Sequence, residues 1–227
     1  MFMLLAAFVI YSTCVSISFV PPIFMDHYFT IDKPAVAEFK DRGSKFIAYA
    51  YHIKTIDDFK QRLKELKNQH PKATHYCFAY RLGLNEINFR VNDDGEPSGT
   101  AGKPILAQID SKSLTNILVI VVRYFGGTLL GVSGLINAYR TATALVLQLT
   151  PIKQKPVEKI YSLHFDYTQI NGVMTIIKQF NCTIIEQEMQ LFSRLIIGVP
   201  VKHLAEVLSM FNELKGVEIT EKNSLHQ

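Results

Sequence analysis

Three carboxylates stand close together in a turn-rich segment, residues 92–104. Asp93, Asp94 and Glu96 offer hard oxygen atoms, which Mg²⁺ prefers as ligands and which also act as general bases. Two other uses fit the same spacing, because Asp-Gly followed by Glu-Pro suits a pair of tight turns, and an acidic patch can contact a partner. The segment does not have the ligand spacing of an EF-hand, so no metal site is assigned from it.

The second part of this segment has groups that can hold a phosphate. Ser98, Thr100 and Lys103 supply two hydroxyls and an ammonium, and Gly99 and Gly102 allow backbone N–H groups to approach an anion. The alternative is a loop whose glycines serve only a backbone with positive φ. The sequence leaves both interpretations open, although loops of this length are often functional.

The run Arg123-Tyr124-Phe125-Gly126-Gly127 follows a buried apolar run and precedes a predicted helix. Arg123 can bind a phosphate through two parallel N–H groups, and Tyr124 and Phe125 can stack on bases or ribose. A helix N-terminus at Ser133 would add a positive partial charge. The alternative is a glycine turn with buried aromatic rings.

The glycines of this region have the gap of a P-loop, between Gly126 and Gly131. Val132, however, stands at the position of the P-loop lysine, which contacts the terminal phosphates of the nucleotide. The sequence therefore argues against ATP hydrolysis of the P-loop type.

Two arginines and a histidine–cysteine pair complete the candidate residues. Arg81 lies in a predicted strand and is a further candidate for phosphate contact. Arg140 lies in a predicted helix among apolar residues, so it should extend to solvent or pair with an acid of the turn-rich segment. His75 and Cys77 face the same side of a strand and are a conceivable base and nucleophile, but no orienting carboxylate is identified and a buried thiol is the alternative.

Turn residues and hydrophobic periodicity predict the elements that position these residues. Two apolar runs flank Arg42-Gly43-Ser44, Thr55 opens a capping box, and Gly83-Leu84-Asn85 separates the strands of a hairpin. The predicted elements of this part are strands 36–39 and 45–52, a helix from Thr55 to His70, strands 74–82 and 86–91, a short helix at 105–109, a strand at 116–122 and a helix from Ser133 to Leu149.

The last third of the chain predicts a second domain. Residues 150–156, with two prolines and two lysines, predict a linker. Beyond it the pattern is strand 159–166, helix 168–180, strands 182–190 and 192–199, helix 202–214 and strand 216–220. This βαββαβ order predicts a ferredoxin-like domain. The chain is therefore expected to be an α+β protein with domains at residues 25–150 and 157–222.

Charge is concentrated in the first domain. Residues 33–150 hold 16 basic and ten acidic residues, whereas residues 151–227 hold eight of each. A basic excess favours RNA or another polyanion as partner, with an ordinary solvated surface as the alternative. The three cysteines are widely separated and show neither a disulfide framework nor metal-ligand spacing, which indicates a reducing, cytoplasmic setting. No cofactor is implied.

Residues 1–24 contain no charged residue, which invites a signal-peptide or membrane-anchor interpretation. No Lys or Arg forms a positive leading region, however, and Pro21-Pro22 ends the apolar run short of the roughly 20 residues that a membrane span needs. We therefore expect Met25 to be the true start and the upstream segment to be a translated leader or a misassigned start. A targeting segment and an element packed on the domain are the alternatives.

Several long motifs of the chain resemble the YigZ/IMPACT family. They are residues 93–106, residues 121–131, Ala138-Tyr139-Arg140, and the earlier segments 44–48 and 73–81. These matches are longer and more specific than a short glycine pattern. The resemblance covers residues 36–149 strongly and the second domain by its architecture only, and the two-domain layout is similar to the bacterial YigZ-like members.

The resemblance implies a first domain similar to domain IV of elongation factor G, with a ribosomal-protein-type βαβ fold, and a second similar to domain V of the same factor. Such a tandem suggests the ribosome or RNA as partner. Eukaryotic IMPACT restrains a starvation-responsive kinase by means of an extra amino-terminal module. The resemblance does not extend to such a module, so the kinase-related role is not expected for this chain.

Three functions follow as hypotheses. The leading one is a non-enzymatic, translation-linked regulatory protein that binds RNA or the ribosome. The residues expected to meet phosphates or bases are Arg81, Ser98, Thr100, Lys103, Arg123, Tyr124, Phe125 and Arg140. The rival is a metal-dependent enzyme acting on a phosphorylated small molecule or nucleotide, with Mg²⁺ held by Asp93, Asp94 and Glu96. The third is a protein-interaction module.

Overall fold

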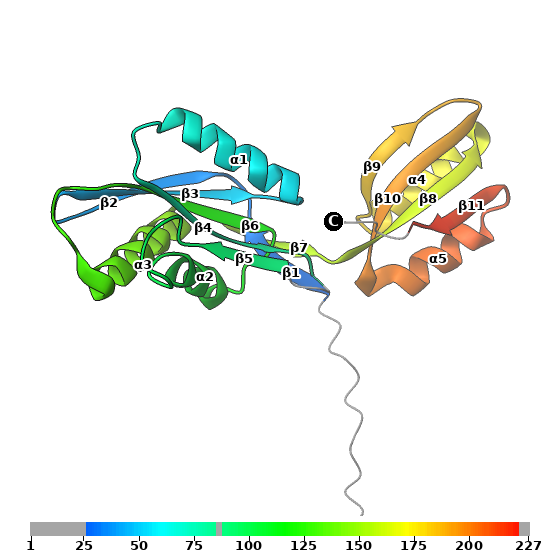
Figure 1. Cartoon of the computed structure of the whole chain (residues 1–227). Coiled ribbons are helices and arrows are strands. Elements are labelled where there is room, and N and C mark those ends of the chain that lie inside the picture. Colours follow the sequence, from blue (N-terminus) through cyan, green and yellow to red (C-terminus); the bar gives the residue numbers. More distant parts are fainter. Residues whose placement is uncertain (1–25, 85–87, 223–227) are drawn as a thin grey trace, which may run out of the picture.

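The computed structural model describes residues 26–84 and 88–222, which form two packed domains joined by an extended segment (Figure 1). The predicted α+β class is confirmed, because both domains contain helices and strands. The predicted leader at residues 1–24 and the predicted start at Met25 lie outside the described residues, as do Cys14 and Asn85 of the predicted hairpin turn.

A five-stranded antiparallel sheet forms the centre of the first domain, in the order β2-β3-β6-β4-β5. The strands are β2 (Ala35–Asp41), β3 (Ser44–His52), β4 (His75–Leu82), β5 (Asn88–Asn92) and β6 (Ile117–Tyr124). β6 lies in the middle of the sheet and is buried on both faces, which explains its continuous apolar, β-branched run. The predicted strands of this domain are confirmed.

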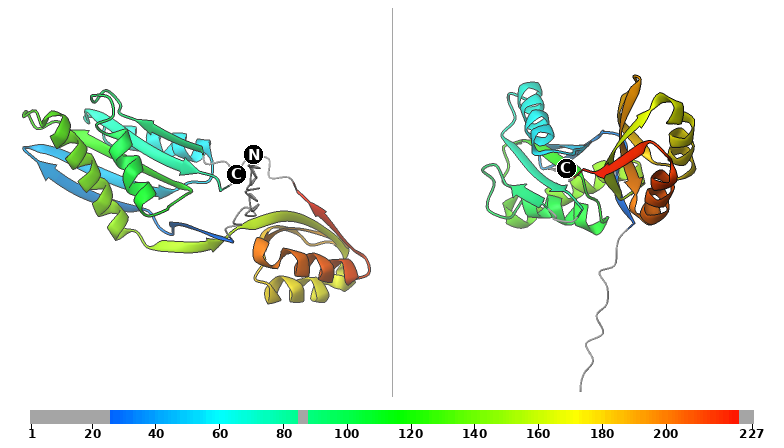
Figure 2. Two further views of the ribbon diagram at one scale, coloured as in Figure 1. Left: turned by 90° about the horizontal axis from the view of Figure 1, so that it is seen from below. Right: turned by 90° about the vertical axis from the view of Figure 1, so that its right-hand side faces the viewer.

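Three helices cover the two faces of this sheet (Figures 1 and 2). They are α1 (Ile56–Gln69) on one face and α2 (Gly102–Ser111) and α3 (Gly131–Leu149) on the other. Each face has its own apolar core: Phe59 and Leu66 of α1 pack into one, and Ile105 and Tyr139 of the opposite helices pack into the other. Successive side chains of a strand point to opposite faces of the sheet, so the strands contribute apolar side chains to both cores.

The capping box predicted for α1 is confirmed. The Asp58 N–H donates to Thr55 Oγ1 at 3.1 Å, and the Thr55 N–H donates to the Asp58 carboxylate at 3.0 Å. Two backbone N–H groups that the helix itself leaves unpaired are thus bonded by side chains within four residues of sequence. This is why the start of α1 can be predicted from the sequence alone.

The starts of α2 and α3 differ from the prediction. α2 begins at Gly102, earlier than expected, because Asp93 Oδ1 accepts the Gly102 N–H at 2.8 Å and supplies a cap from nine residues upstream. α3 begins at Gly131, so Ser133 lies in its first turn and is not the N-cap. Leu130 is the N-cap residue, and its side chain cannot accept a hydrogen bond.

The segment predicted as a linker contains a strand, which the prediction did not include. β7 (Ile152–Pro156) pairs antiparallel with β1 (His27–Ile31), a strand the sequence did not indicate. Lys153 and Asp32, which lie 121 residues apart, approach to 3.4 Å beside this ribbon. Local sequence does not reveal such pairing, because the partner comes from the far end of the domain.

The second domain has the predicted βαββαβ element order. Its elements are β8 (Glu158–Asp166), η1 (Tyr167–Gln169), α4 (Ile170–Gln179), β9 (Thr183–Glu188), β10 (Phe192–Pro200), η2 (Val201–His203), α5 (Leu204–Glu213) and β11 (Val217–Glu221). The antiparallel sheet has the order β11-β8-β10-β9. Val173 of α4 and Phe211 of α5 pack with Leu163 and Leu195 of the sheet into a separate core.

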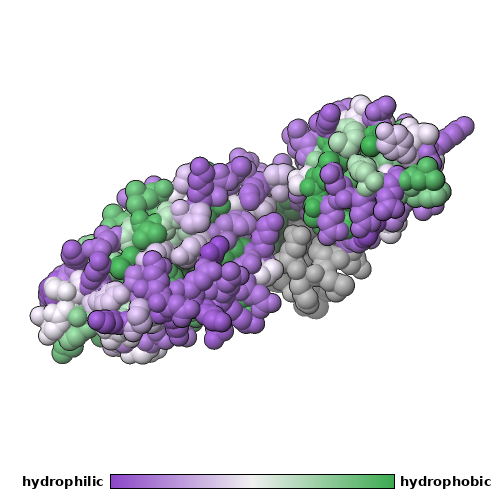
Figure 3. Space-filling view, turned by 90° about the horizontal axis from the view of Figure 1, so that it is seen from above, coloured by the Kyte–Doolittle hydropathy of each residue, from purple (hydrophilic) through white to green (hydrophobic). Residues whose placement is uncertain are grey.

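The face of the first domain that α1 covers has a hydrophilic area beside an apolar one (Figure 3). Lys60 and Lys64 of α1 are exposed there, as expected for the polar side of an amphipathic helix. Within residues 26–84 and 88–222, no helix has the length and apolar character needed to cross a membrane.

Candidate functional site

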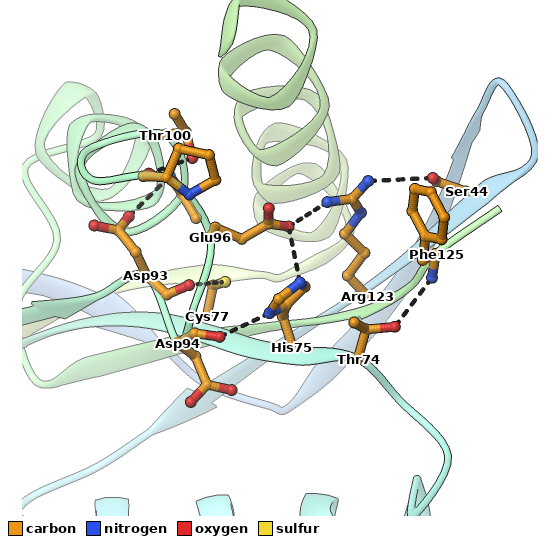
Figure 4. A network of polar contacts seen from close by, with 12 residues as sticks. Ser44, Thr74, His75, Cys77, Asp93, Asp94, Glu96, Thr100, Arg123 and Phe125 are labelled. Carbon is orange, nitrogen blue, oxygen red and sulfur yellow. Dashed lines mark hydrogen bonds and ion pairs between the residues drawn. The ribbon is translucent and has the colours of Figure 1, made fainter. Parts of the chain in front are cut away.

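Segments that are far apart in the sequence meet at one end of the five-stranded sheet (Figure 4). The register places Phe46 of β3 and His75 of β4 on either side of Arg123 in β6. The turn between β2 and β3 touches the loop after β6, since a Cβ atom on Gly126 would lie only 1.9 Å from the carbonyl carbon of Gly43. Glycine is required for this backbone contact.

A buried ion pair lies at the centre of this site. Arg123 Nη1 donates to Glu96 Oε1 at 2.5 Å, and the Tyr139 hydroxyl of α3 donates to the same oxygen at 2.7 Å. The side chains of Arg123 and Glu96 are only 5% and 3% exposed. Arg123 Nη2 also donates to Ser44 Oγ at 3.4 Å. The arginine predicted to bind phosphate is thus paired with one of the carboxylates predicted to bind a metal.

The Arg123 guanidinium also contacts two aromatic rings. Its central carbon lies 5.3 Å from the ring centre of Phe46 and 5.6 Å from that of Phe125. Phe46 is fully buried, whereas Phe125 is 47% exposed. Cation–π contact therefore holds one face of the Phe125 ring, while part of the ring faces solvent.

Asp93 shapes the loop and the start of α2. Its carboxylate accepts the N–H groups of Gly99, Ala101 and Gly102 at 2.8 to 3.0 Å. Burial alone would raise the pKa of this carboxyl, but the three N–H donors outweigh it and lower the pKa below its usual value. The Asp93 carboxylate is thus a cap for the protein's own backbone.

His75 is fixed by the turn that follows Asp93. The carbonyl oxygen of Asp94 can only accept, so His75 Nδ1 donates to it, at 2.7 Å. The Nε2 of a neutral His75 is then an acceptor, and it lies 3.9 Å from Glu96 Oε1, too far for a hydrogen bond. The Asp94 carboxylate accepts the Tyr76 N–H at 2.7 Å, which ties this turn to β4.

Cys77 shares a strand face with His75, but its thiol is fully buried. It donates towards the Asp93 carbonyl at 3.0 Å and contacts the Tyr139 hydroxyl at 3.2 Å. Burial raises the pKa of the Cys77 thiol far above its ordinary value. The thiolate needed for nucleophilic attack is therefore not formed near neutral pH, and the buried-thiol alternative is the one observed.

A cleft of about 310 Å³ opens beside the ion pair. Its polar lining comes from His75, Glu96 and Arg123. Its apolar lining comes mainly from the loop between β6 and α3 and the start of α3, including Leu129, Leu130, Val132 and Leu135. Leu129 is 82% exposed, so the rim of the cleft is apolar as well.

The other residues predicted to meet phosphates or bases are scattered. Ser98 and Lys103 are exposed beside the site, whereas Thr100 is buried and donates to the Pro97 carbonyl at 2.6 Å. Tyr124 faces the α1 side of the sheet, where its hydroxyl lies 2.9 Å from His70 Nδ1. Neighbouring residues of a strand point to opposite faces, which separates Tyr124 from Arg123.

Within the described residues, neither of the two remaining arginines contacts the ion pair of Arg123 and Glu96. Arg81 lies six residues along β4 from His75, about 20 Å at the usual strand rise, and forms an ion pair with Asp110 of α2. Arg140 is exposed on α3, so the first of its two predicted options, extension to solvent, is the one observed.

The carboxylates do not form a metal site in the described part of the chain, where no cluster of three His, Cys, Asp or Glu side chains has the required geometry. Asp93 is bonded to backbone N–H groups and Glu96 to Arg123 and Tyr139. The predicted arrangement with Mg²⁺ on Asp93, Asp94 and Glu96 would require these bonds to break.

Sequence reasoning assigned no role to Ser44 or Tyr139, which both contact the ion pair. Ser44 is fully buried and also accepts the Gly126 N–H at 3.2 Å. Tyr139 is the one phenol on the buried face of α3, and a buried phenol needs a hydrogen-bond partner. The need for a hydrogen-bond partner was the signal by which the sequence could have indicated a role for Tyr139, although it does not identify Glu96 as that partner.

Comparison with known proteins gives consistent matches over most of the chain. The Impact N-terminal domain family matches residues 42–147. A Haemophilus influenzae protein called IMPACT family member is 33% identical over 202 residues, which are 88% of this chain and 94% of that protein. The Escherichia coli protein called IMPACT family member YigZ is 35% identical over 168 residues, or 73% of this chain and 82% of that protein.

Two further comparisons concern a solved structure and a eukaryotic relative. A crystal structure described as that of an hypothetical protein has a TM-score of 0.67 and 29% identity, and the match covers 88% of this chain and 99% of that one. A Saccharomyces cerevisiae protein called Protein IMPACT homolog is 34% identical over 96 residues, which are 40% of this chain and 36% of that protein. Similarity to the eukaryotic protein is thus confined to a part of each chain.

Proposed function

Because this chain belongs to the IMPACT family, we propose that it is a translation-linked regulatory protein that binds RNA or the ribosome in the cytoplasm. The resemblance of its two domains to domains IV and V of elongation factor G supports a ribosomal partner. The binding surface in this proposal consists of exposed side chains of the turn-rich segment, the loop after β6 and α3, namely Ser98, Lys103, Phe125 and Arg140.

The observation that carries the proposal is that carboxylates of the site are bonded within the protein, whereas cationic and aromatic side chains are exposed. The carboxylates of Asp93 and Glu96 are bonded to protein groups. The side chains of Lys103 and Arg140 are exposed cations, and the Phe125 ring is half exposed. Outward cations attract backbone phosphates, and an exposed ring can stack on an unpaired base.

Arg123 has a positioning role in this proposal and not a direct contact with phosphate. Its guanidinium is held by Glu96 and contacts one face of the Phe125 ring. Such support keeps the ring in a fixed orientation before a base arrives, and less entropy is then lost on binding.

The test is the salt dependence of binding to labelled single-stranded RNA and to purified small ribosomal subunits. The double change Lys103→Glu with Arg140→Glu should weaken binding and lower the slope of log affinity against log salt by about 0.7 for each phosphate that the protein no longer neutralises. The matched control is Lys60→Glu with Lys64→Glu, an equal charge change on the exposed side of α1. No binding, or an equal decrease in affinity in both variants, rejects the proposal.

Stacking is tested separately through Phe125. Phe125→Ala should weaken RNA binding by about 1–3 kcal/mol, whereas Phe125→Tyr should keep most of the affinity because a ring remains. The side chain is half exposed, so both variants should fold, and circular dichroism checks this. Equal affinity of the alanine variant and the unchanged protein would show that the ring does not stack on RNA.

A protein partner is the second candidate, favoured by the exposed apolar rim of the cleft. Leu129 is 82% and Val132 is 59% exposed, and large apolar side chains that cluster at a surface often mark interaction sites. Leu129→Ser would then abolish ribosome binding that survives nuclease treatment, while leaving binding to free RNA unchanged. The enzyme hypothesis has weaker support, because its carboxylates are already bonded within the protein.

A further inference from the structure

A second cavity lies where the ribbon of β1 and β7 meets the second domain. Its volume is about 320 Å³. Pockets that bind small molecules have volumes of about 300–1,000 Å³, so this cavity has room for a small ligand. Residues 26–27 and 154–156 line it from the ribbon, and residues 180–181 and 200–203 line it from the second domain. Among the described residues, it shares no lining residue with the cleft beside Arg123.

Backbone hydrogen bonds hold the segments of this cavity together. β7 leads directly into β8 (Figure 1), and Val157 between the two strands bonds to both sides of the cavity. Its N–H donates to the Asp26 carbonyl at 2.9 Å, and its carbonyl accepts the Val201 N–H at 2.8 Å. The cavity is therefore formed before a ligand binds, which lowers the entropy lost on binding.

The charged lining of the cavity is mainly basic. Lys155 comes from β7 and Lys202 from η2, and the one carboxylate of the lining, Asp26, is bonded to His27 Nδ1 at 2.6 Å. Two lysines stand against one carboxylate, so the lining is positively charged even when His27 and His203 are neutral. Within residues 26–84 and 88–222, neither lysine forms an ion pair. Two cations, one from each domain, are thus available to a ligand.

The surroundings of Lys155 give a further reason to expect an anion. Burial lowers the pKa of its ammonium group below the usual value, and the like charges of Lys54 and Lys153 lower it further. Both effects disfavour the charged form of Lys155 in the free protein. An anion bound beside this ammonium group would offset both of them.

The rest of the lining suits a flat apolar group. Phe180 and Pro200 are buried in the wall of the cavity, and Pro156 faces it from the ribbon. The His203 ring lies against Phe180, with 5.5 Å between the ring centres. Aromatic rings pack favourably on such flat surfaces. The cavity therefore combines two cations with apolar walls.

We propose that this cavity binds a small molecule that carries both a phosphate monoester and an aromatic ring, the chemistry of a nucleoside monophosphate. The phosphate contacts Lys155 and Lys202, and the ring packs beside Phe180 and His203. A monoester has a charge of about −1.5 to −2 near neutral pH, which matches two lysines better than the single charge of each phosphate in an RNA backbone. Because the two lysines belong to different domains, the ligand bridges the domains.

This inference does not rest on the proposed function. RNA binding in that proposal uses Ser98, Lys103, Phe125 and Arg140, and none of these residues lines the cavity. Either binding event can therefore fail without the other.

Three molecules with the same body and different charge test the head group. Adenosine 5′-monophosphate, its methyl ester and adenosine carry about two, one and no negative charges at about pH 7.5. Each is titrated into the full chain while the amide NMR signals of Lys155, Asn181 and Lys202 are followed. The monophosphate should bind and shift signals on both sides of the cavity. The methyl ester should bind more weakly, and adenosine about tenfold or more weakly, because charge-assisted contacts to the lysines are lost.

Three outcomes of this titration overturn the proposal. They are no binding of the monophosphate, adenosine binding as tightly as the monophosphate, and shifts confined to one of the two domains. Inorganic phosphate tests the body, since it has a similar charge and no ring. It should bind more weakly than the monophosphate, and equal affinities would overturn the apolar part of the site.

Matched variants test the two lysines. Lys202→Glu should weaken monophosphate binding about tenfold or more, because a cation is replaced by an anion. Its control is Lys215→Glu, an equal charge change at an exposed lysine of the second domain that does not line the cavity. On β7, Lys155→Gln should weaken binding, whereas Lys153→Gln should have little effect. Thermal melts check that the variants fold, and equal weakening by a variant and its control rejects a contact at that lysine.

A competition experiment separates a free monoester from an RNA backbone as the source of the phosphate. An excess of single-stranded RNA without terminal phosphates should leave the monophosphate bound, because the RNA contacts other side chains. Displacement of the monophosphate by this RNA, together with weaker RNA binding by Lys202→Glu, would assign the cavity to the RNA backbone and overturn the small-molecule ligand. If the monophosphate binds and RNA does not, the proposed function fails and the assignment of the cavity stands.

Discussion

The guanidinium of Arg123 and the carboxylate of Glu96 are each almost fully removed from water, and each is the main partner of the other. Burying a charge away from water is costly, so each of these two groups can be buried there only when it is paired with the other. Removing one leaves an uncompensated charge, whereas removing both leaves none. At the scale of single residues, the pair is therefore a structural requirement on which the exposed side chains around it depend.

Arg123→Met should lower the free energy of unfolding by about 3–5 kcal/mol, because Glu96 then stays buried without its cation. The double variant Arg123→Met with Glu96→Gln should lose less than the sum of the two single changes. Urea denaturation measures all three. Lys103→Met is the control, since an exposed lysine should change the free energy by no more than about 0.5 kcal/mol. Strict additivity of the two site changes would contradict this account.

Asp93→Asn should lower the free energy of unfolding at neutral pH by about 0.5–2 kcal/mol, as expected for a weakened helix cap. The pKa of Asp93 is lowered in the folded protein, so its carboxylate stabilises the fold above the unfolded-state pKa, and this stabilisation is lost as the pH falls through the folded-state value. The difference in free energy of unfolding between the Asp93→Asn variant and the unchanged protein should therefore shrink below about pH 4. Thermal melts of both proteins from pH 7 to pH 3 measure this difference. A stability difference that does not change with pH would contradict the role of the Asp93 carboxylate as a cap.

At the scale of elements, the site depends on contacts between turns. The turn between β2 and β3 packs against the loop that leads from β6 to α3, and the closest approach is between the backbones of Gly43 and Gly126. This contact brings Ser44 to Arg123 and to the Gly126 N–H. The ribbon of β1 and β7 is built in the same way, from segments that meet only after folding.

Gly126→Ala should destabilise the protein more than Gly127→Ala. A Cβ atom at Gly126 would lie 1.9 Å from the Gly43 carbonyl carbon, so the two turns must separate. Gly127 has a φ of +83° and no atom within 4 Å of an added Cβ, so alanine there has mainly the left-handed backbone cost of about 1–2 kcal/mol. Denaturation midpoints and the NMR signal of the Gly126 amide measure the two effects. Equal destabilisation would argue against a tight turn-to-turn contact.

At the scale of the whole molecule, the two domains have separate cores and different charge. The first domain has cores on both sides of its sheet, and the second has one between its sheet and two helices. The basic excess of six lies in residues 33–150, while residues 151–227 are balanced. Electrostatic attraction of a polyanion therefore belongs to the first domain.

If the proposed function holds, a fragment of residues 26–156 should bind RNA with the affinity of the full chain and with the same dependence of affinity on salt. The fragment contains both cores of the first domain, the β1–β7 ribbon and the basic excess. A fragment of residues 157–222 should not bind the same RNA. Fluorescence anisotropy at several salt concentrations compares the three proteins. Stronger binding by the second fragment would place the RNA contact in the other domain.

Much of the fold was readable from the sequence because the relevant signals are short-range. Thr55 and Asp58 specify the start of α1 within one turn, and the β-branched run of β6 specifies a strand buried on both faces. The βαββαβ order of the second domain followed from the same periodicity. The start of α2 was misjudged because its cap, Asp93, lies nine residues before it across a turn.

The sequence by itself determined most of the elements, the family resemblance and the placement of the basic excess, but not the ribbon of β1 and β7. Only the tertiary structure decided which candidate residues share a site. It joined Arg123 to Glu96, Ser44 and Tyr139, and it put Tyr124 on the opposite face and Arg81 at the other end of β4. The physical reason is that periodicity and capping act over a few residues, whereas burial and ion pairing depend on which distant segments the folded chain brings together.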